Sequence, residues 1–171
     1  INKRTGTDFV AIPHNANLSW GKMFQVEDSE GNPITADYAE RRMRWERVVE
    51  TTQIKGDSET HPALAPTDEF SDFERYNFIL VPNGDRSKPD AADYVRSALK
   101  RGLEIEAKTG VNPYKFGLIG STDAHTGMSA IEETRFAGKG QTDSRPELRK
   151  NPTGLGWAHG WDMRAAGLVA A

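Results

Sequence analysis

The feature that most constrains this 171-residue sequence is a long amphipathic stretch that leads through a turn into a short apolar run. Apolar residues recur at helical spacing and Gly110 follows as a C-terminal cap, so the sequence predicts a helix over Ala91–Thr109. A turn at Asn112-Pro113 precedes Phe116–Ile119, which predicts a buried strand. A helix that leads directly into a buried strand is typical of an α/β fold. The expected buried side of the helix comprises Val95, Ala98, Leu99, Leu103 and Ile105.

The residues after this strand carry groups that bind metals. Gly120, Ser121 and Thr122 are followed by Asp123 and His125. If the extended conformation continues, positions i and i+2 project to the same side, so the carboxylate and the imidazole point together. Such a pair suits zinc, manganese or iron. An aspartate in this context also often caps a helix, so this stretch alone leaves both interpretations open.

Two further segments predict strands with ligand residues in or after them. Phe9–Ile12 is apolar and Pro13 stops further sheet pairing, which predicts a short buried strand with His14 at its end. A histidine there occupies the position of catalytic residues in (β/α) barrels, although a histidine satisfied by loop backbone is the simpler alternative. Val48–Ile54 is β-rich and contains Glu50, which either faces outward or, if buried, requires a metal or a basic partner.

The segment from Lys55 to Pro62 is dense in polar groups for a stretch that follows a strand. Lys55 could bind a phosphoryl oxygen, and His61 could ligate a metal or transfer protons. For either residue alone, a place in a solvated loop is the simpler interpretation.

The remaining elements are expected to be structural. A helix should begin at Thr35 and run to Glu46, with Asp37 in its first turn. A second helix should follow the cap residue Thr67, over Asp68–Arg75, with Phe70 and Phe73 in the core. Further expectations are a short strand or buried turn over Asn77–Pro82, a long loop over residues 127–160, and a His159 that packs between Trp157 and Trp161.

The composition narrows the class of protein. A hydrophobic content of 36% and a mean hydropathy of −0.67 are low for a self-contained core, which favours a loop-rich chain or a part of something larger. A net charge of −3 argues against nucleic acid as a partner. No apolar run is long enough to span a membrane. There is no cysteine, which is compatible with cytoplasm or periplasm. Because the chain starts at Ile1 without an initiator Met, we expect a single-domain fragment, residues 1–171.

Three motifs resemble the PHP (polymerase and histidinol phosphatase) superfamily, which comprises metal-dependent phosphoesterases on a distorted (β/α)7 barrel. They are Ala11-Ile-Pro-His14, Val49-Glu50 and Gly120-Ser-Thr-Asp-Ala-His125, and the last differs from Gly-Ser-Asp-x-His by the inserted Thr122. Ala11–Asn15, Gln53–Glu59 and the same third motif resemble more closely a bacterial PHP-like family long catalogued as a domain of unknown function. The resemblance covers nearly the whole chain. It implies a loop-rich, incomplete C-terminal part of a TIM-like barrel, without the initial His-x-His strand, that needs the rest of its barrel or an oligomer partner.

The sequence and the resemblance together favour a metal-dependent hydrolase of small-molecule phosphate or phosphonate esters that uses metal-activated water. One alternative is an amidohydrolase-like C–N hydrolase, which would use a similar ligand set. Another is a non-catalytic α/β scaffold that retains remnants of a metal site. The expected metal ligands are His14, Asp123, His125 and Glu50, and the expected catalytic residues are His61, Lys55 and Glu50.

Overall fold

The structure is a computed structural model that describes residues 2–75, 89–127, 132–135 and 140. Its elements follow the chain in the order α1 (Asn2–Thr5), η1 (Ala16–Leu18), α2 (Ala36–Trp45), β1 (Val48–Gln53), β2 (Gly56–Asp57), η2 (Ala91–Asp93), α3 (Val95–Thr109), β3 (Gly117–Gly120) and η3 (Glu133–Arg135). The chain therefore has the mixed α/β character that the helix-to-strand step predicts. Among the described residues, no helix is both long and apolar enough to cross a membrane.

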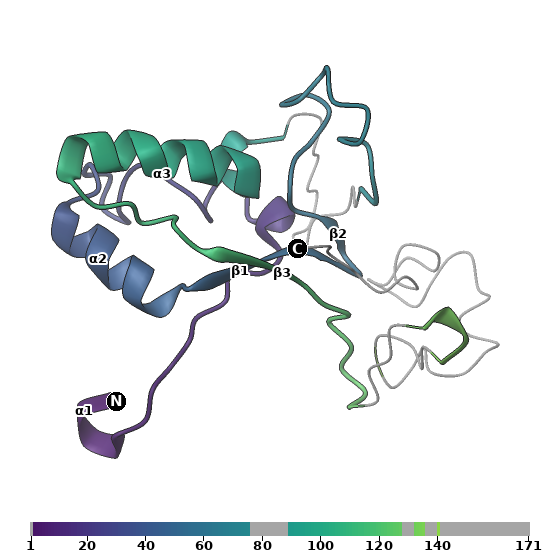
Figure 1. Cartoon of the computed structure of the whole chain (residues 1–171), viewed down its shortest axis with the longest axis horizontal. Coiled ribbons are helices and arrows are strands. Elements are labelled where there is room, and N and C mark those ends of the chain that lie inside the picture. The colour runs from purple at the N-terminus through teal and green to yellow at the C-terminus, as the bar shows by residue number, and fades with distance from the viewer. Residues whose placement is uncertain (1, 76–88, 128–131, 136–139, 141–171) are drawn as a thin grey trace.

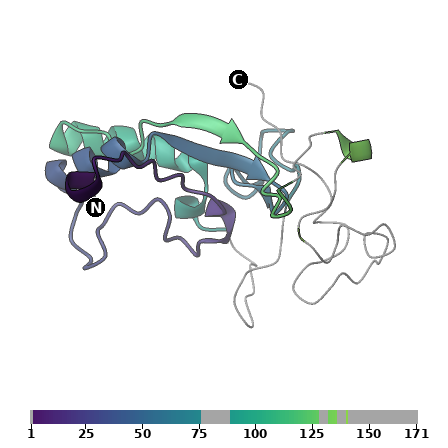
Figure 2. The ribbon, with the colours of Figure 1, turned by 90° about the horizontal axis from the view of Figure 1, so that it is seen from below.

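A three-stranded sheet of order β2-β1-β3 lies at the centre of the molecule. β1 and β3 are parallel, with Val48 opposite Gly117 and Glu50 opposite Ile119, whereas β1 and β2 form an antiparallel hairpin. Helix α3 lies between β1 and β3 in the sequence and runs along one side of the sheet, while the N-terminal segment approaches from the other side (Figures 1 and 2). The sheet formed by the described residues is open and does not close into a barrel.

The core joins α2, α3 and the sheet through an aromatic cluster. The ring of Phe24 lies 5.6 Å from that of Tyr114, edge to face, and 5.8 Å from that of Phe116. The guanidinium of Arg42 on α2 lies 4.8 Å from the centroid of the Tyr114 ring and donates to the Tyr114 hydroxyl. Burial raises the pKa of Tyr114 to about 12, so this phenol stays protonated at neutral pH. The aliphatic part of the core comprises Ala16, Ile34, Ala39, Val49, Val95, Ala98 and Ile105.

Local sequence signals explain where α2 begins and where α3 ends. The Thr35 hydroxyl accepts a hydrogen bond from the Tyr38 backbone N–H and caps α2, so the helix begins one residue after the predicted start. Gly110 adopts φ 81° and ends α3, as predicted. The predicted helix over 91–109 is divided, because the Asp90 carboxylate accepts from the Ala92 N–H and caps the separate turn η2.

Two residues that were expected on the buried side of α3 are exposed. Leu99 is 37% and Leu103 is 63% accessible, whereas Val95, Ala98 and Ile105 are buried. Helical spacing places all five on a broad face, but the described residues cover only the part of that face that meets the sheet and Phe24. The expectation for Leu99 and Leu103 is therefore wrong.

The strand predicted over Phe9–Ile12 is not formed, and its side chains are exposed. The segment lies beside β1 and makes two backbone hydrogen bonds with its surroundings, from Ala11 N to Trp45 O and from Glu50 N to Pro13 O. Pro13 has no N–H to donate, so the ladder does not continue. The segment thus reaches the position of a strand without pairing as one.

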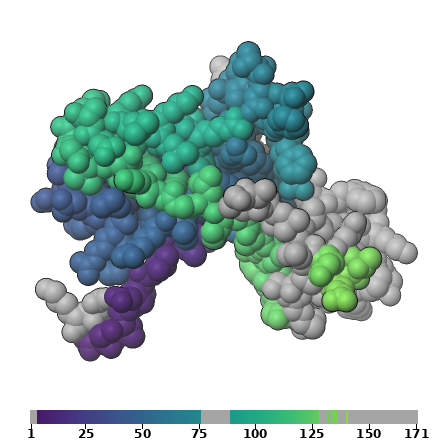
Figure 3. Space-filling view, in the orientation of Figure 1, coloured from purple at the N-terminus to yellow at the C-terminus, as the bar shows by residue number. Residues whose placement is uncertain are grey.

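The helix predicted over Asp68–Arg75 is also wrong, because the segment forms turns. The Asp68 carboxylate accepts from the Phe70 N–H, two residues on, and this local bond competes with helical pairing. Phe70 is 76% and Phe73 is 62% exposed, so neither belongs to the core. Figure 3 shows this part of the chain as a lobe at the upper right of the molecule.

Two of the three predicted strands that carry or precede site residues are present. β1 covers Val48–Gln53 of the predicted Val48–Ile54, and β3 is displaced by one residue, to Gly117–Gly120. Phe116 is buried but precedes β3, whereas within β3 Gly117 and Leu118 are exposed and Ile119 and Gly120 are half-buried, so the expectation of a buried strand is wrong. The strand or buried turn expected over Asn77–Pro82, His159 and most of the loop over 127–160 lie outside the described residues.

Candidate functional site

The carboxyl ends of the parallel strands β1 and β3 meet at one edge of the sheet, as parallel pairing requires. Glu50 lies within β1, and Ser121, Asp123 and His125 follow β3. Lys55 lies in the tight turn between β1 and β2. In α/β folds, ligands bind at the carboxyl ends of the strands, so this edge is the natural place for a site.

Glu50 is a buried carboxylate with only one of its oxygens engaged. Its residue is 6% exposed, and Oε1 accepts a hydrogen bond from the Ser121 hydroxyl. Oε2 is buried and has no hydrogen-bond partner within the described part of the chain. The carboxylate is therefore not the outward-facing glutamate of the alternative interpretation. A buried charge with an unpaired oxygen is costly, which marks this oxygen as a candidate ligand atom.

Two adjacent threonines follow Glu50, and their hydroxyls differ. The pairing of β1 with β3 shifts by one residue between Glu50 and Thr52, which is a β-bulge. The Thr51 hydroxyl donates to Ile119 O at 2.9 Å across this bulge. Thr52 Oγ1 is buried and has no partner among the residues that the structure describes. Bulges often redirect side chains next to functional sites. Nothing in the sequence distinguishes Thr52, because a threonine in a strand looks like an ordinary β-former.

Asp123 lies between a buried ammonium and an imidazole. Its Oδ2 forms an ion pair with Lys55 Nζ, and their side chains are 17% and 6% exposed. Its Oδ1 lies 3.0 Å from His125 Nε2, and the His125 side chain is 64% exposed. Asp123 adopts φ 47°, a left-handed conformation that aspartate tolerates better than most residues. The predicted Asp-x-His pair is thus in contact, with the carboxylate shared between His125 and Lys55.

A network of side chains buries the turn that carries Lys55. The Lys55 N–H donates to Gln53 Oε1 at 2.8 Å, and Lys55 O accepts from Asn17 Nδ2 at 3.0 Å. Gln53 Nε2 in turn donates to Asn15 Oδ1, and the Ser58 hydroxyl donates to Asn17 Oδ1. Hairpin turns are normally exposed, so these bonds explain how this one brings its lysine against Asp123.

The two other predicted histidines lie in different surroundings. His14 is exposed, with Nδ1 3.4 Å from Ile12 O, and it directly follows Pro13, whose carbonyl accepts from the Glu50 N–H. His61 is half-buried, with Nδ1 accepting from the Ala63 N–H at 3.1 Å. The His61 ring lies 5.9 Å from the ring of Tyr94, just before α3.

The predicted ligands do not gather into one metal centre within residues 2–75, 89–127, 132–135 and 140. No group of three or more His, Asp or Glu side chains there is arranged to hold an ion. Both Asp123 oxygens already have partners, whereas Glu50 Oε2 and Thr52 Oγ1 have none within the described residues, so these two oxygens are the atoms that best fit a cation. Carboxylate and hydroxyl oxygens are hard ligands that suit magnesium or manganese.

The carboxyl group of Asp57 in β2 has a pKa that is raised above the usual value for an aspartate. Burial raises its pKa from 3.8 to about 6, and the nearby Glu59 carboxylate adds to the rise. Hydrogen bonds from the Glu59 and Thr60 N–H groups and the charge of Arg96 act in the opposite direction. Asp57 lies opposite Thr52 in the hairpin, so its charge state affects the same region of the sheet.

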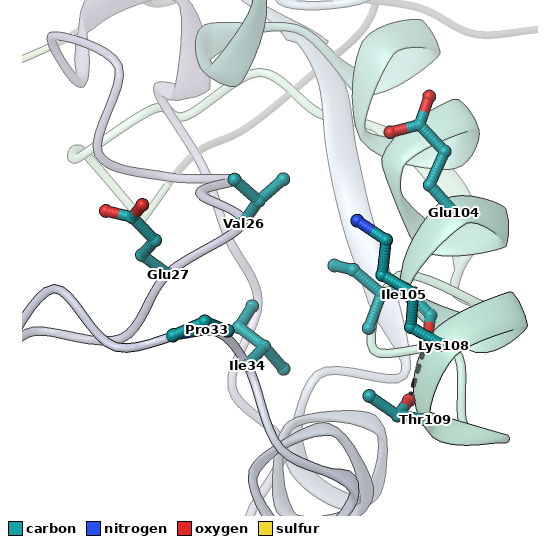
Figure 4. A pocket seen from close by; sticks show the side chains of 8 residues that line it. All are labelled: Val26, Glu27, Pro33, Ile34, Glu104, Ile105, Lys108 and Thr109. Atoms are coloured by element: carbon teal, nitrogen blue, oxygen red, sulfur yellow. Dashed lines mark hydrogen bonds between the residues drawn. The ribbon is translucent and has the colours of Figure 1, made fainter.

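A cavity of about 370 Å³ lies elsewhere, between the loop over residues 26–34 and the C-terminal half of α3 (Figure 4). Val26, Ile34 and Ile105 face one another across it, and Lys108 and Glu104 lie on its helical side. None of the residues at the carboxyl ends of β1 and β3 lines it. The cavity is thus separate from the candidate site.

These features define an α/β chain whose parallel β1–α3–β3 unit places a buried glutamate and an Asp–His pair at one sheet edge. A family model matches residues 1–171, and the chain belongs to this family, DUF3604, described as a protein of unknown function. No curated protein and no solved structure matches the chain.

Proposed function

We propose that the protein is a metal-dependent hydrolase of phosphate or phosphonate esters, with its site at the carboxyl ends of β1 and β3. The observation that carries the proposal is Glu50 Oε2, a buried carboxylate oxygen with no partner in the described residues. Structural carboxylates in a strand interior normally have both oxygens satisfied, whereas a ligand carboxylate keeps one for its ion.

The neighbouring residues support this assignment through their positions. Ser121 holds Glu50 by donating to Oε1, which leaves Oε2 to face a ligand. Asp123 and His125 follow the adjacent parallel strand and are in contact at 3.0 Å. His14 follows Pro13, whose carbonyl accepts from the Glu50 backbone N–H, so the chain brings His14 beside β1.

In this proposal Glu50, Asp123 and His125 would hold a divalent metal, with His14 as a further ligand. A bound metal supplies Lewis acidity, which polarises a phosphoryl oxygen and lowers the pKa of a coordinated water. Lys55 is 5% exposed and paired with Asp123, so its role is to hold that carboxylate rather than to contact substrate. His61 remains a candidate for proton transfer on the lobe that follows β2.

The finer fold assignment belongs to the same proposal. A parallel β1–α3–β3 unit is the repeating unit of (β/α) barrels, and the extended segment before His14 lies beside β1 as a preceding strand would. We propose that the chain is part of a distorted (β/α)7 barrel of PHP type, completed by further strands of its own polypeptide or by a partner.

Metal titration by calorimetry tests the proposal. We expect Mn²⁺ or Zn²⁺ to bind the full chain and Glu50→Gln or Asp123→Ala to weaken binding at least about tenfold. Glu40→Gln, which changes an exposed carboxylate on α2, is the matched control and should bind as the wild type does. Equal affinity in Glu50→Gln would refute the site.

Hydrolysis assays with an aryl phosphate, an aryl phosphonate and an anilide then separate the reaction classes. Cleavage of the anilide alone would favour the C–N hydrolase over the phosphoesterase.

One observation favours the rival proposal of a non-catalytic scaffold. The Lys55 ammonium and the His125 ring already satisfy both oxygens of Asp123, as in a structural ion-pair network. On that hypothesis Asp123→Ala lowers the stability of the fold but leaves metal content unchanged, and the titration above distinguishes the two.

A further inference from the structure

The bulge in β1 sets two chemically identical neighbours in contrasting surroundings. Thr51 and Thr52 are both buried, at 3% and 8% exposure. The Thr51 hydroxyl is satisfied by Ile119 O at 2.9 Å, whereas Thr52 Oγ1 has no partner within the described part of the chain. A hydroxyl that served only to build the sheet would be expected to bond as Thr51 does.

Within the described residues, neither strand beside Thr52 provides a hydrogen-bond partner for its hydroxyl. Its partner residue on β3 is Gly120, which has no side chain. Its partner on β2 is Asp57, whose two carboxylate oxygens accept from the Glu59 and Thr60 N–H groups. Glu50, two residues earlier on β1, carries the other buried side-chain oxygen without a partner among the described residues, Oε2.

The charge around Thr52 indicates which kind of ligand fits. Glu50 and Asp57 are both carboxylic acids, and a carboxylate oxygen can only accept hydrogen bonds or bind a cation. An anionic group at this position would be repelled by the acidic residues two positions earlier on β1 and opposite on β2, whereas a cation would be attracted by them. A hydroxyl oxygen can bind a hard cation through its lone pairs, as threonine does with Mg²⁺ in phosphate-binding loops.

We infer that Thr52 contributes its hydroxyl oxygen, together with Glu50 Oε2, to a divalent-cation site that prefers Mn²⁺ or Mg²⁺ to Zn²⁺. The inference rests on the proposed metal-dependent function and adds a ligand that is neither a histidine nor a carboxylate. The preference follows because each hard oxygen added to the expected ligands makes the set more suitable for Mn²⁺ and Mg²⁺, which retain several waters, and less suitable for zinc. Thr52 thereby contributes to the metal selectivity of the site.

The test compares Thr52→Val with Thr51→Val, since valine keeps the shape of threonine and removes only the hydroxyl. In chelator, without metal, we expect Thr52→Val to melt at or above the wild-type temperature because it removes an unsatisfied buried group. Thr51→Val should melt about 3 °C lower, because it leaves Ile119 O without its donor. In Mn²⁺ titrations Thr52→Val should bind about tenfold more weakly, while Thr52→Ser and Thr51→Val bind as the wild type does.

Each outcome decides the matter. Wild-type Mn²⁺ affinity in Thr52→Val, or a loss of melting temperature equal to that of Thr51→Val, would overturn the role of Thr52. Weaker binding in Glu50→Gln together with unchanged binding in Thr52→Val would overturn this inference and leave the proposed function standing. Unchanged binding in both variants, or no binding in the wild type, would overturn both. A wild-type preference for Zn²⁺ over Mn²⁺ that Thr52→Val leaves unaltered would refute the assigned selectivity.

Discussion

The ion pair between Lys55 and Asp123 should be one of the strongest polar interactions in the described structure, and a double-mutant cycle can measure it. The pair joins the β1–β2 turn to the segment after β3, and both side chains are largely buried. Lys55→Met removes the ammonium and keeps much of its aliphatic volume. Asp123→Asn removes the negative charge and keeps an oxygen that can still accept from His125.

The size of the effect follows from burial. Two unit charges about 3 Å apart attract by roughly 5 kcal/mol at an effective dielectric of 20, before desolvation is counted. Removing one partner of a fully buried pair costs about 3–5 kcal/mol. The Asp123 side chain is 17% exposed and keeps His125 as a neighbour, so we expect about 2 kcal/mol for each single variant. The double variant should lose no more than either single one, which gives a coupling energy of about 2 kcal/mol.

Urea unfolding in chelator at pH 7.5 is the assay, with the pair Arg96–Glu59 as the control. Those two side chains are 41% and 48% exposed, so their cycle should give less than about 1 kcal/mol and should weaken in high salt. The Lys55–Asp123 coupling should persist in high salt because solvent ions reach it poorly. A coupling below about 0.5 kcal/mol would refute the reasoning, since it would mean that water separates the two groups in solution.

Two further predictions concern the fold around the site. Gly102→Ala would normally stabilise a helix by about 1 kcal/mol, but the new Cβ would lie 2.2 Å from Asn112 Oδ1, which accepts from the Tyr114 N–H. We expect Gly102→Ala to lower the free energy of unfolding in urea by about 1–3 kcal/mol. The double variant Gly102→Ala/Asn112→Ala should relieve this loss. A higher free energy of unfolding in the single variant would contradict the packing. The raised pKa of Asp57 means that the folded chain binds its proton more tightly than the unfolded chain, so stability is lost as the pH rises from about 4 to about 6. Asp57→Asn should therefore match the wild type at pH 4 and exceed it at pH 8 by at most roughly 3 kcal/mol, and an equal difference at both pH values would be the contrary result.

The sequence predicts the elements that rest on local signals. The cap at Thr35 and Gly110 after α3 act on their own neighbours, so composition and spacing identify them. β1 is recognisable for the same reason, as a run of β-branched residues. Phe9–Ile12 and Asp68–Arg75 were predicted wrongly because their apolar residues suggested burial that no described element provides. Whether an apolar side chain is covered depends on what packs against it, and a linear pattern does not contain that information.

The residues of the candidate site also fall into two groups, those that the sequence identifies and those that only the structure identifies. The motif around Asp123 and His125 and the position of Glu50 in a strand are visible in the sequence, and the structure brings the first pair into contact. That Lys55 is buried against Asp123 could not be read from the sequence, because a lysine in a polar turn is normally solvated. Thr52 carried no signal at all.

The sequence by itself determined the residue chemistry, the helices with strong caps and the order of helix and strand around the site. These depend on interactions between residues a few positions apart, whose geometry is the same in any fold. Only the tertiary structure decided that Glu50 keeps one oxygen without a described partner, that Asp123 is shared by Lys55 and His125, and that Thr52 differs from Thr51. Those outcomes depend on the parallel pairing of β1 with β3 and on a one-residue bulge, which join residues about 70 positions apart.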